Sequence, residues 1–330
     1  MKRTSILSIC LLFVILLVYF LGPKPGKPIF NLVIPSVPEI NFLESYIQKS
    51  EKRHTIKAGN EAKIIWFDTL QSQTDYALVY LHGFSASHEE GNPLHLQSAK
   101  KLKANLYLSR LADHGIDTVD QMLQFSPDRL WESGKKALAI GKKLGKKVVL
   151  MGTSNGAALA LQLAAMYPDQ VYALILLSPN IEINEKGVFL LNNPWGLQLA
   201  RAIVGQDFRE LVGKSKTYTQ YWYTKYRLES VVAVQHFVEH TMTKETFSKV
   251  KQPVLMLYYY KNDKQQDKVV KVEPMLRMFE ELGTTKNLKF KKAIPEAGNH
   301  VLSSYVTSKD LVTPQEEIDK FIGFLNTEIK

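Results

Sequence analysis

Short apolar runs of strand length alternate with longer helical patterns along most of the chain. Several of these runs are almost wholly apolar, which is typical of strands that are buried on both faces of a parallel sheet. Helices between the runs, for example over residues 127–144 and 155–167, would then cover the two faces. Strands are predicted at residues 63–68, 76–81, 105–108, 147–151, 171–177, 253–260 and 288–294. We therefore expect an α/β fold with a mostly parallel sheet and with functional sites at the carboxyl ends of its strands.

The alternation stops between about residues 181 and 250, where no buried strand is recognisable. This pattern predicts a helical lid inserted into the domain. The lid sequence carries a dense aromatic cluster, formed by Tyr218, Tyr221, Trp222, Tyr223 and Tyr226. Such a cluster is usually core packing, but beside a site it can also form the wall of an apolar pocket.

The N-terminal segment has its own pattern, because no charged residue occurs between Arg3 and Lys24. A run of this length predicts an uncleaved transmembrane helix over residues 1–21, since no small-residue cleavage site follows it. The positive charges at Lys2 and Arg3 favour an inside N-terminus, so the catalytic domain of this single-pass membrane protein is expected on the extracytoplasmic side. Residues 22–45 are proline-rich and predict a stiff linker, followed by one domain over residues 46–330.

Composition narrows the classes of partner. The chain has 330 residues, of which 45% are hydrophobic and 22% charged, and this excludes a disordered or multi-span membrane protein. The net charge of +10 is not accompanied by a nucleic-acid-binding motif, so no nucleic-acid partner is expected. Cys10 is the single cysteine in the sequence, so neither an internal disulfide nor a cysteine-based zinc site can form.

A candidate nucleophile lies in a short glycine-flanked segment between the strand at residues 147–151 and the helix at 155–167. Its sequence is Gly152-Thr153-Ser154-Asn155-Gly156. In a strand, sharp turn and helix of this kind the serine hydroxyl is exposed, and side chains at the two glycine positions would collide across the bend. The alternative interpretation is a glycine-rich turn without chemistry.

A candidate oxyanion hole follows the strand at residues 76–81, at His82-Gly83-Phe84. The backbone N–H of Phe84 and that of Asn155, at the start of the next helix, would donate two hydrogen bonds to a developing oxyanion. Only the backbone is needed here, so the side chain of His82 is interpreted as a buried structural histidine.

A serine hydroxyl needs a base, and the base needs a carboxylate that fixes its tautomer. His300 is the candidate base, because it lies on a loop of small residues just past the strand at 288–294. Asp267 is the preferred acid, on the loop after the strand at 253–260, and Asp263 on the same loop is the alternative. The order along the chain is then Ser, Asp, His.

From about Ala62 to its C-terminus, the sequence resembles the α/β-hydrolase family in these motifs and in their order. The resemblance implies an α/β-hydrolase fold and a serine hydrolase with a helical lid. One departure is the loop between residues 260 and 267, which is longer than usual and keeps Asp263 as an alternative acid.

These patterns together predict a membrane-anchored serine hydrolase that cleaves carboxylic esters of small molecules or lipid-like substrates through an acyl-enzyme. A thioesterase or a lipase would use the same mechanism. No cofactor or metal is expected. Two other classes remain as alternatives: a zinc peptidase that uses His236, Glu239 and His240, which match an H-x-x-E-H pattern, and a non-catalytic interaction module on the same scaffold.

Overall fold

A seven-stranded sheet forms the centre of the computed structural model, which describes residues 2–327. The strand order is β1-β3-β2-β4-β5-β8-β11; β1 pairs antiparallel with β3, and every other pair is parallel. Each strand predicted from the apolar runs is present, so the expected α/β architecture is confirmed. The strands are β1 (Lys63–Ile65), β2 (Thr74–Leu81), β3 (Asn105–Leu108), β4 (Gly145–Thr153), β5 (Ala173–Leu177), β8 (Val254–Tyr258) and β11 (Lys289–Ala293).

Helices cover both faces of the sheet, and each face has its own hydrophobic core. Successive residues of the central strand β2 face opposite cores, for example Leu78 and Val79. Helices α4 (Pro127–Leu144), α5 (Asn155–Met166) and α10 (Val272–Glu281) pack on one face, and α3 (Leu94–Leu102) and α11 (Val312–Thr327) pack on the other. Helix α4 begins where the sequence predicts, because the Ser126 hydroxyl accepts a hydrogen bond from the N–H of Arg129.

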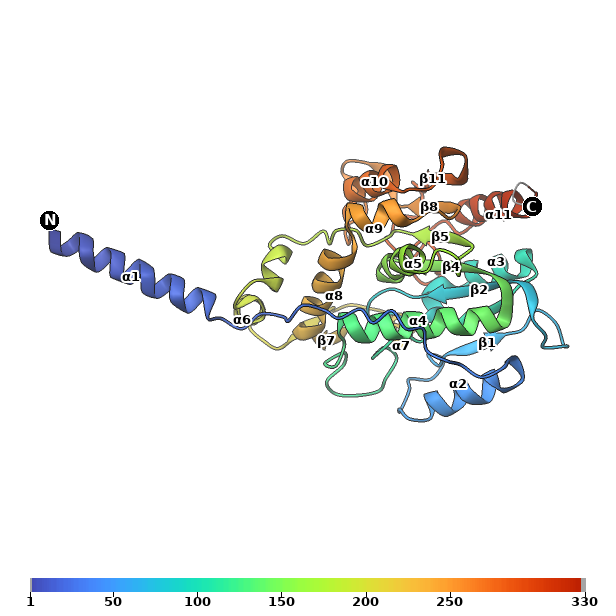
Figure 1. The fold of residues 1–330 in the computed structure, drawn as a ribbon, viewed down its shortest axis with the longest axis horizontal. Helices are drawn as coiled ribbons and strands as arrows, with labels where there is room; N and C mark the ends of the chain where they lie inside the picture. The colour runs from blue at the N-terminus through green and yellow to red at the C-terminus, as the bar shows by residue number, and fades with distance from the viewer. Residues whose placement is uncertain (1, 328–330) are drawn as a thin grey trace.

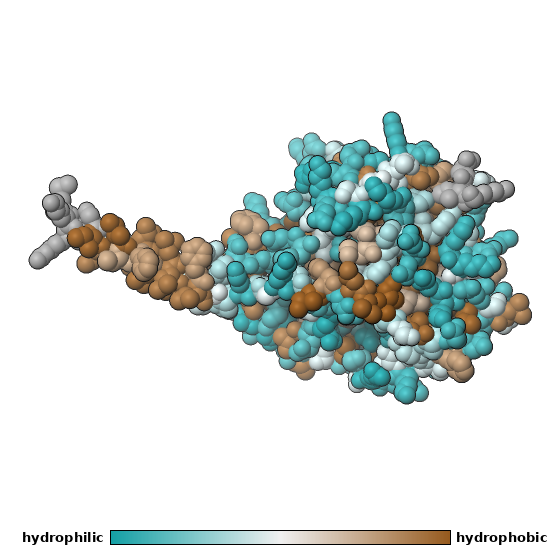
Figure 2. Space-filling model, in the orientation of Figure 1, coloured by the Kyte–Doolittle hydropathy of each residue, from teal (hydrophilic) through white to brown (hydrophobic). Residues whose placement is uncertain are grey.

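The N-terminal helix α1 (Lys2–Phe20) projects away from the rest of the molecule, and its apolar surface is exposed (Figures 1 and 2). The prediction of a transmembrane helix is nevertheless wrong, since none of the helices within residues 2–327 is both long and apolar enough to cross a membrane. The single-pass localisation, the extracytoplasmic orientation and the membrane as a partner depended on this helix and are corrected with it. The predicted anchor begins at Met1 and the predicted domain ends at residue 330; Met1 and residues 328–330 lie outside the described residues.

The chain between α1 and the short helices η1 (Ile40–Phe42) and α2 (Leu43–Glu51) runs along α4 (Figure 1). Its backbone carbonyls accept hydrogen bonds from buried side chains of the domain. The indole N–H of Trp131 donates to Asn31, and the ammonium of Lys135 donates to Val33, each at 2.7 Å. This part of the proline-rich segment is therefore fixed to the surface of α4.

Residues between β5 and β8 form the region predicted as a lid. It is mainly helical, and it also holds a small antiparallel sheet of two strands that the sequence does not predict, because each strand has only three residues and they form no continuous buried run. Its elements are η3 (Val188–Asn192), α6 (Gly196–Val204), β6 (Phe208–Glu210), α7 (Lys216–Tyr221), β7 (Lys225–Arg227), α8 (Leu228–Thr241) and α9 (Lys244–Lys249). The remaining short elements are η2 (His88–Gly91), β9 (Tyr260–Asn262), β10 (Gln265–Gln266) and η4 (Lys286–Leu288).

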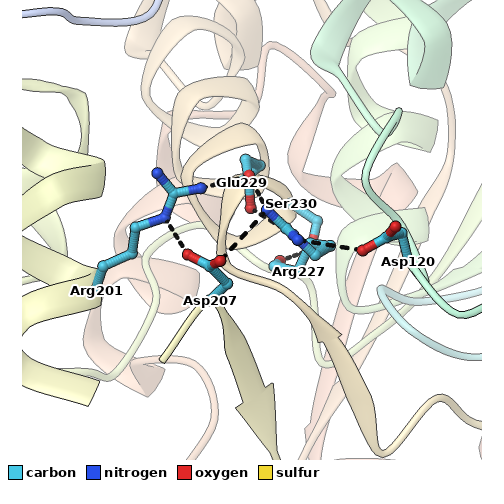
Figure 3. A network of polar contacts seen from close by, with 6 residues as sticks. All are labelled: Asp120, Arg201, Asp207, Arg227, Glu229 and Ser230. Atoms are coloured by element: carbon cyan, nitrogen blue, oxygen red, sulfur yellow. Dashed lines mark hydrogen bonds and ion pairs between the residues drawn. The ribbon is translucent and has the colours of Figure 1, made fainter. Parts of the chain in front are cut away.

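A network of charged side chains ties this lid region together and to the body of the domain (Figure 3). Arg227 at the end of β7 bonds Glu229 at 2.7 Å and also bonds Asp120, in the loop between β3 and α4, at 3.1 Å. Arg201 of α6 bonds the same Glu229 at 2.8 Å and Asp207 at 2.7 Å. The two arginines therefore share one carboxylate, which connects α6, β7 and α8.

Candidate active site

Ser154 lies on a strained turn between β4 and α5. Its φ of 54° and ψ of −116° are unfavourable for a residue with a side chain, and this strain is typical of a nucleophile on a sharp strand-to-helix turn. Space for the turn exists only because glycines flank it: a Cβ on Gly156 would lie 2.0 Å from the carbonyl oxygen of Leu81, and one on Gly152 would lie 2.6 Å from the carbonyl of Gly156. The sequence-based reason for these glycines therefore agrees with the geometry.

His300 and Asp267 lie side by side at the carboxyl edge of the sheet. The distance from His300 Nδ1 to Asp267 Oδ2 is 2.6 Å, and both side chains are buried. The other oxygen of Asp267, Oδ1, accepts hydrogen bonds from the backbone N–H groups of Val269 and Val270 at 2.8 and 3.1 Å. The carboxylate is therefore held in one orientation, and it places the imidazole proton on Nδ1.

The electrostatics of His300 follow from this pair. Burial alone lowers the pKa of His300, but the negative charges of Asp267 and Glu90 raise it by more, so the pKa lies above its ordinary value. The second ring nitrogen, Nε2, is buried without a hydrogen-bond partner among residues 2–327. It is thus available to a group in the cavity that His300 and Ser154 both line.

Ser154 and His300 share this cavity but form no direct hydrogen bond in the described part of the chain. Ser154 is only 8% exposed, and this exposure opens into the cavity rather than onto the outer surface. A reacting group would therefore reach the hydroxyl through the cavity. Contacts of this kind often tighten only when substrate is bound.

The candidate oxyanion segment His82-Gly83-Phe84 leads into a turn over residues 83–86, and nearly all backbone donors of this oxyanion turn are in use. The N–H of Gly83 donates to Glu90 Oε2 at 2.5 Å, and that of Ser85 donates to His114 Nε2 at 3.1 Å. The N–H of Phe84 has no acceptor among the described residues, and neither does that of Asn155, the first residue of α5. These are the two donors predicted from the sequence, and both remain free to bind an oxyanion.

Two neutral histidines support this turn. His82 Nε2 accepts a hydrogen bond from the N–H of Leu111, so its Nδ1 carries the proton and donates to the carbonyl of Gly83. Burial holds the pKa of His82 well below its ordinary value and lowers the pKa of His114 to about 4. Both rings are uncharged near neutral pH, and the side chain of His82 is structural, as expected.

Glu90 is a residue of this site that the sequence does not reveal. It is 2% exposed, lines the same cavity as Ser154 and His300, and binds the N–H of Gly83. Burial raises its pKa to about 7. In the sequence it follows His88 and Glu89 and looks like an ordinary surface acid, because glutamate is rarely buried.

Asp263, the alternative acid, lies away from His300. It is exposed and accepts a hydrogen bond from the hydroxyl of Tyr260 at 2.8 Å. The extra residues of this loop form the hairpin of β9 and β10, and Asp263 lies at its turn. The structure therefore brings Asp267, and not Asp263, into contact with His300.

The lid region forms most of the wall of the shared cavity, which we call the lid cavity. Its volume is about 560 Å³. Apolar side chains of α6 and α8, including Leu199, Ile203 and Val234, line it together with three residues of the aromatic cluster, Tyr218, Trp222 and Tyr226. The aromatic cluster therefore serves both purposes expected from the sequence: these three residues form part of a pocket wall, and Tyr223 packs in the hydrophobic core.

The candidate zinc residues lie on α8. His236 and His240 face each other edge to face at 4.4 Å, and His240 Nδ1 is bonded to the backbone carbonyl of His236. Glu239 is bonded by the side-chain amide of Asn192. Nowhere in residues 2–327 do three or more histidine, cysteine or acidic side chains come together in a way that could hold a metal ion. The pair therefore lacks a further ligand.

Comparison with known proteins gives a match to one family model and to several solved structures. A family model described as "Serine aminopeptidase, S33" matches residues 136–296, just under half of the chain. No curated protein sequence matches. Among solved structures, the metagenome-derived lipolytic enzymes LipS and LipT give a TM-score of 0.65 at 17% identity, over 82% of this chain and 99% of theirs. The monoacylglycerol lipase of Paleococcus ferrophilus gives a TM-score of 0.55 at 14% identity, over 79% of this chain and 97% of its own. Est1E of Butyrivibrio proteoclasticus with bound ferulic acid gives a TM-score of 0.52 at 17% identity, over 84% of this chain and 99% of its own.

At these identities the structural similarity establishes the fold. The parallel sheet and the structural neighbours show an α/β-hydrolase fold, and the serine on its sharp turn and the family match over residues 136–296 support an α/β-hydrolase family.

Proposed function

We propose that this protein is a serine hydrolase that cleaves carboxylic esters. The observation that carries the proposal is one juxtaposition: Ser154 on its strained turn and the unpartnered Nε2 of His300 line the same cavity, while Asp267 binds the opposite nitrogen of the imidazole. This is the set of groups that nucleophilic acyl transfer requires.

In the first half of the reaction, the hydroxyl oxygen of Ser154 attacks the ester carbonyl carbon and His300 Nε2 takes the hydroxyl proton. The carbonyl oxygen becomes an oxyanion, which the N–H groups of Phe84 and Asn155 stabilise. When the tetrahedral intermediate collapses, the bond to the alcohol oxygen breaks and His300 returns the proton to that oxygen. An alcohol leaves, and the acyl group remains on Ser154.

In the second half, water replaces the alcohol. His300 removes a proton from the water as it attacks the acyl carbon, and then protonates Ser154 as the carboxylic acid leaves. Asp267 holds the imidazole in the correct tautomer during both halves. Each donor on Phe84 and Asn155 contributes a factor of about 10² to 10³ to the rate in comparable sites.

The apolar lining of the lid cavity favours substrates with an apolar acyl or alcohol group. A volume of about 560 Å³ lies within the usual range for small-molecule sites. The lipolytic names of two structural neighbours, with TM-scores of 0.65 and 0.55, agree with an ester-cleaving function of this kind. We therefore infer medium-length acyl esters as the first substrates to test.

Active-site labelling tests the proposal directly. The wild-type protein should react covalently with a fluorophosphonate probe and hydrolyse 4-nitrophenyl esters. Ser154→Ala should lose both reactions, and His300→Ala should lose most of both. A matched control is Ser308→Ala, which changes a partly buried serine outside the lid cavity. Labelling that persists in Ser154→Ala, or a folded wild-type protein that neither reacts nor hydrolyses, would refute the proposal.

A further inference from the structure

A second cavity adjoins the proposed active site. We call it the hairpin cavity, because the β9–β10 hairpin forms one of its walls; its volume is about 430 Å³. It is also lined by residues of the loop that carries His300, such as Gly298 and Asn299. Four residues, Lys268, Val269, Asn299 and His300, line both cavities, so the two cavities adjoin beside the imidazole.

The hairpin cavity is strongly cationic. Four of its lining residues are lysines and only one, Glu296, is acidic. Lys261 binds Glu296 at 2.9 Å and neutralises it. The ammonium groups of Lys264, Lys268 and Lys309 have no carboxylate partner in the part of the chain that the structure describes. Three unpaired positive charges therefore surround a concave site next to the imidazole.

The lid cavity is more apolar than the hairpin cavity. Its lining also includes the cations Lys186, Arg209, Lys214 and Lys268 and the acids Glu185 and Glu90, of which Glu90 is buried. An anionic group placed among its apolar side chains would lose hydration, and beside Glu90 it would lie near a carboxyl group of the same sign when Glu90 is ionised. The carboxylate of Asp267 is fully covered and paired with His300, so it does not contact a group bound in the hairpin cavity.

We propose that the hairpin cavity binds an anionic group of the substrate, a carboxylate or a phosphate, while the lid cavity binds its apolar part. This inference rests on the proposed function and adds a substrate class to it: amphiphilic esters that carry a negative charge on one side of the scissile bond. The long loop after β8 then has a role, because its extra residues supply Lys264 and one wall of the anion site.

Two matched substrate pairs test the proposal and distinguish the two anions. The first pair is mono-4-nitrophenyl glutarate and 4-nitrophenyl pentanoate, which differ in a terminal carboxylate on the acyl side. The second pair is 1-octanoylglycerol 3-phosphate and 1-octanoylglycerol, which differ in a phosphate on the alcohol side. Rates without enzyme are subtracted. In at least one pair, we expect kcat/KM to be about tenfold higher for the anionic member, mainly through KM.

The charge origin of this preference is tested with variants and salt. The triple variant Lys264→Ala, Lys268→Ala, Lys309→Ala should lose the preference. The double variant Lys264→Ala, Lys309→Ala spares Lys268, which also lines the lid cavity; it should weaken the preference and keep the hydrolysis of the neutral esters. The triple variant Lys100→Ala, Lys101→Ala, Lys286→Ala is a control with the same loss of charge. Its exposed lysines precede β3 and β11, so they lie toward the amino ends of the strands, away from the active site at the carboxyl ends. Raising salt from 0.1 M to 1 M shortens the screening length from about 10 Å to about 3 Å and should reduce the preference in the wild type.

The outcomes separate this inference from the function on which it rests. Hydrolysis of neutral esters without preference for either anionic partner overturns the anion site alone. An equal loss of preference in the control triple variant also overturns it, because the effect would then come from net charge. Absence of hydrolysis with every ester, together with absence of labelling at Ser154, instead refutes the proposed hydrolase function.

Discussion

Replacing Asp267 with asparagine should abolish most activity without changing the fold, and the hydrogen bonds around this residue explain why. Oδ1 of Asp267 accepts two backbone N–H groups, from Val269 and Val270. In Asp267→Asn the amide oxygen must keep this position, because an NH₂ group there would face two donors. The NH₂ group is then forced to face Nδ1 of His300.

The consequence falls on the tautomer of His300. Its Nδ1 would have to accept a hydrogen bond from the amide, so the proton would move to Nε2, the nitrogen that must take the proton of Ser154. A wrong tautomer of this kind lowers kcat by about 10⁴, which corresponds to about 5.5 kcal/mol of transition-state stabilisation. The loss should be in kcat, and KM should change little.

Steady-state hydrolysis of a 4-nitrophenyl ester measures this effect, with thermal unfolding as the check on the fold. Asp263→Asn is the matched control: its exposed side chain only accepts a hydrogen bond from Tyr260, which an amide oxygen also accepts, so its kcat should stay within about twofold of the wild type. A folded Asp267→Asn variant that retains more than a tenth of the wild-type kcat would refute the reasoning, as would an equal loss in Asp263→Asn.

Three further changes test other parts of the structure. Gly156→Ala should lower the free energy of unfolding by at least about 3 kcal/mol, because the added Cβ would lie 2.0 Å from the carbonyl oxygen of Leu81 in β2. The control is Gly323→Ala on α11, which has open space around it and should not lower the free energy of unfolding in this way. Chemical denaturation compares the two variants. The pKa of Glu90 is about 7 in the folded protein and 4.5 in the unfolded chain. Its contribution to the free energy of unfolding, about 3 kcal/mol, is therefore complete below pH 4.5 and disappears as the pH rises through 7. Glu90→Gln should therefore flatten the dependence of stability on pH, and it should shift the acidic limb of the pH–kcat/KM profile to lower pH, because removing this negative charge lowers the pKa of His300. Arg227→Ala should cost about 1 kcal/mol in thermal unfolding, because it breaks ion pairs that are only partly exposed; an unchanged midpoint would contradict this.

The fold could be predicted from the sequence wherever burial leaves a periodic or continuous apolar signal. Strands β4, β5 and β8 are almost wholly buried, and each corresponds to an apolar run. The strands β6 and β9 are exposed and mostly polar, so they leave no such signal. The N-terminal prediction failed for a different reason: it took the absence of charge as evidence for a membrane span, and none of the helices within residues 2–327 is long and apolar enough to form one.

The candidate site divides in the same way between local and distant contacts. Ser154 could be predicted because its glycines and its strand-to-helix context lie within a few residues. The sequence favoured Asp267 over Asp263 but kept both, since the choice depends on which carboxylate meets His300 in space. Glu90 gave no signal at all, because only the tertiary structure shows that this glutamate is buried.

The oxyanion turn connects these observations with the lid. Its donors are fixed by partners that lie at different distances along the chain, with Glu90 seven residues from Gly83 and His114 29 residues from Ser85. The carbonyl of Ser85 also accepts a hydrogen bond from the N–H of Tyr223, in the lid, at 2.7 Å. The lid therefore holds the backbone that presents the Phe84 N–H, in addition to forming the apolar wall. Because oxyanion stabilisation depends on donors that are in place before the reaction, a change that displaces Tyr223 should lower kcat even for substrates too short to contact the lid.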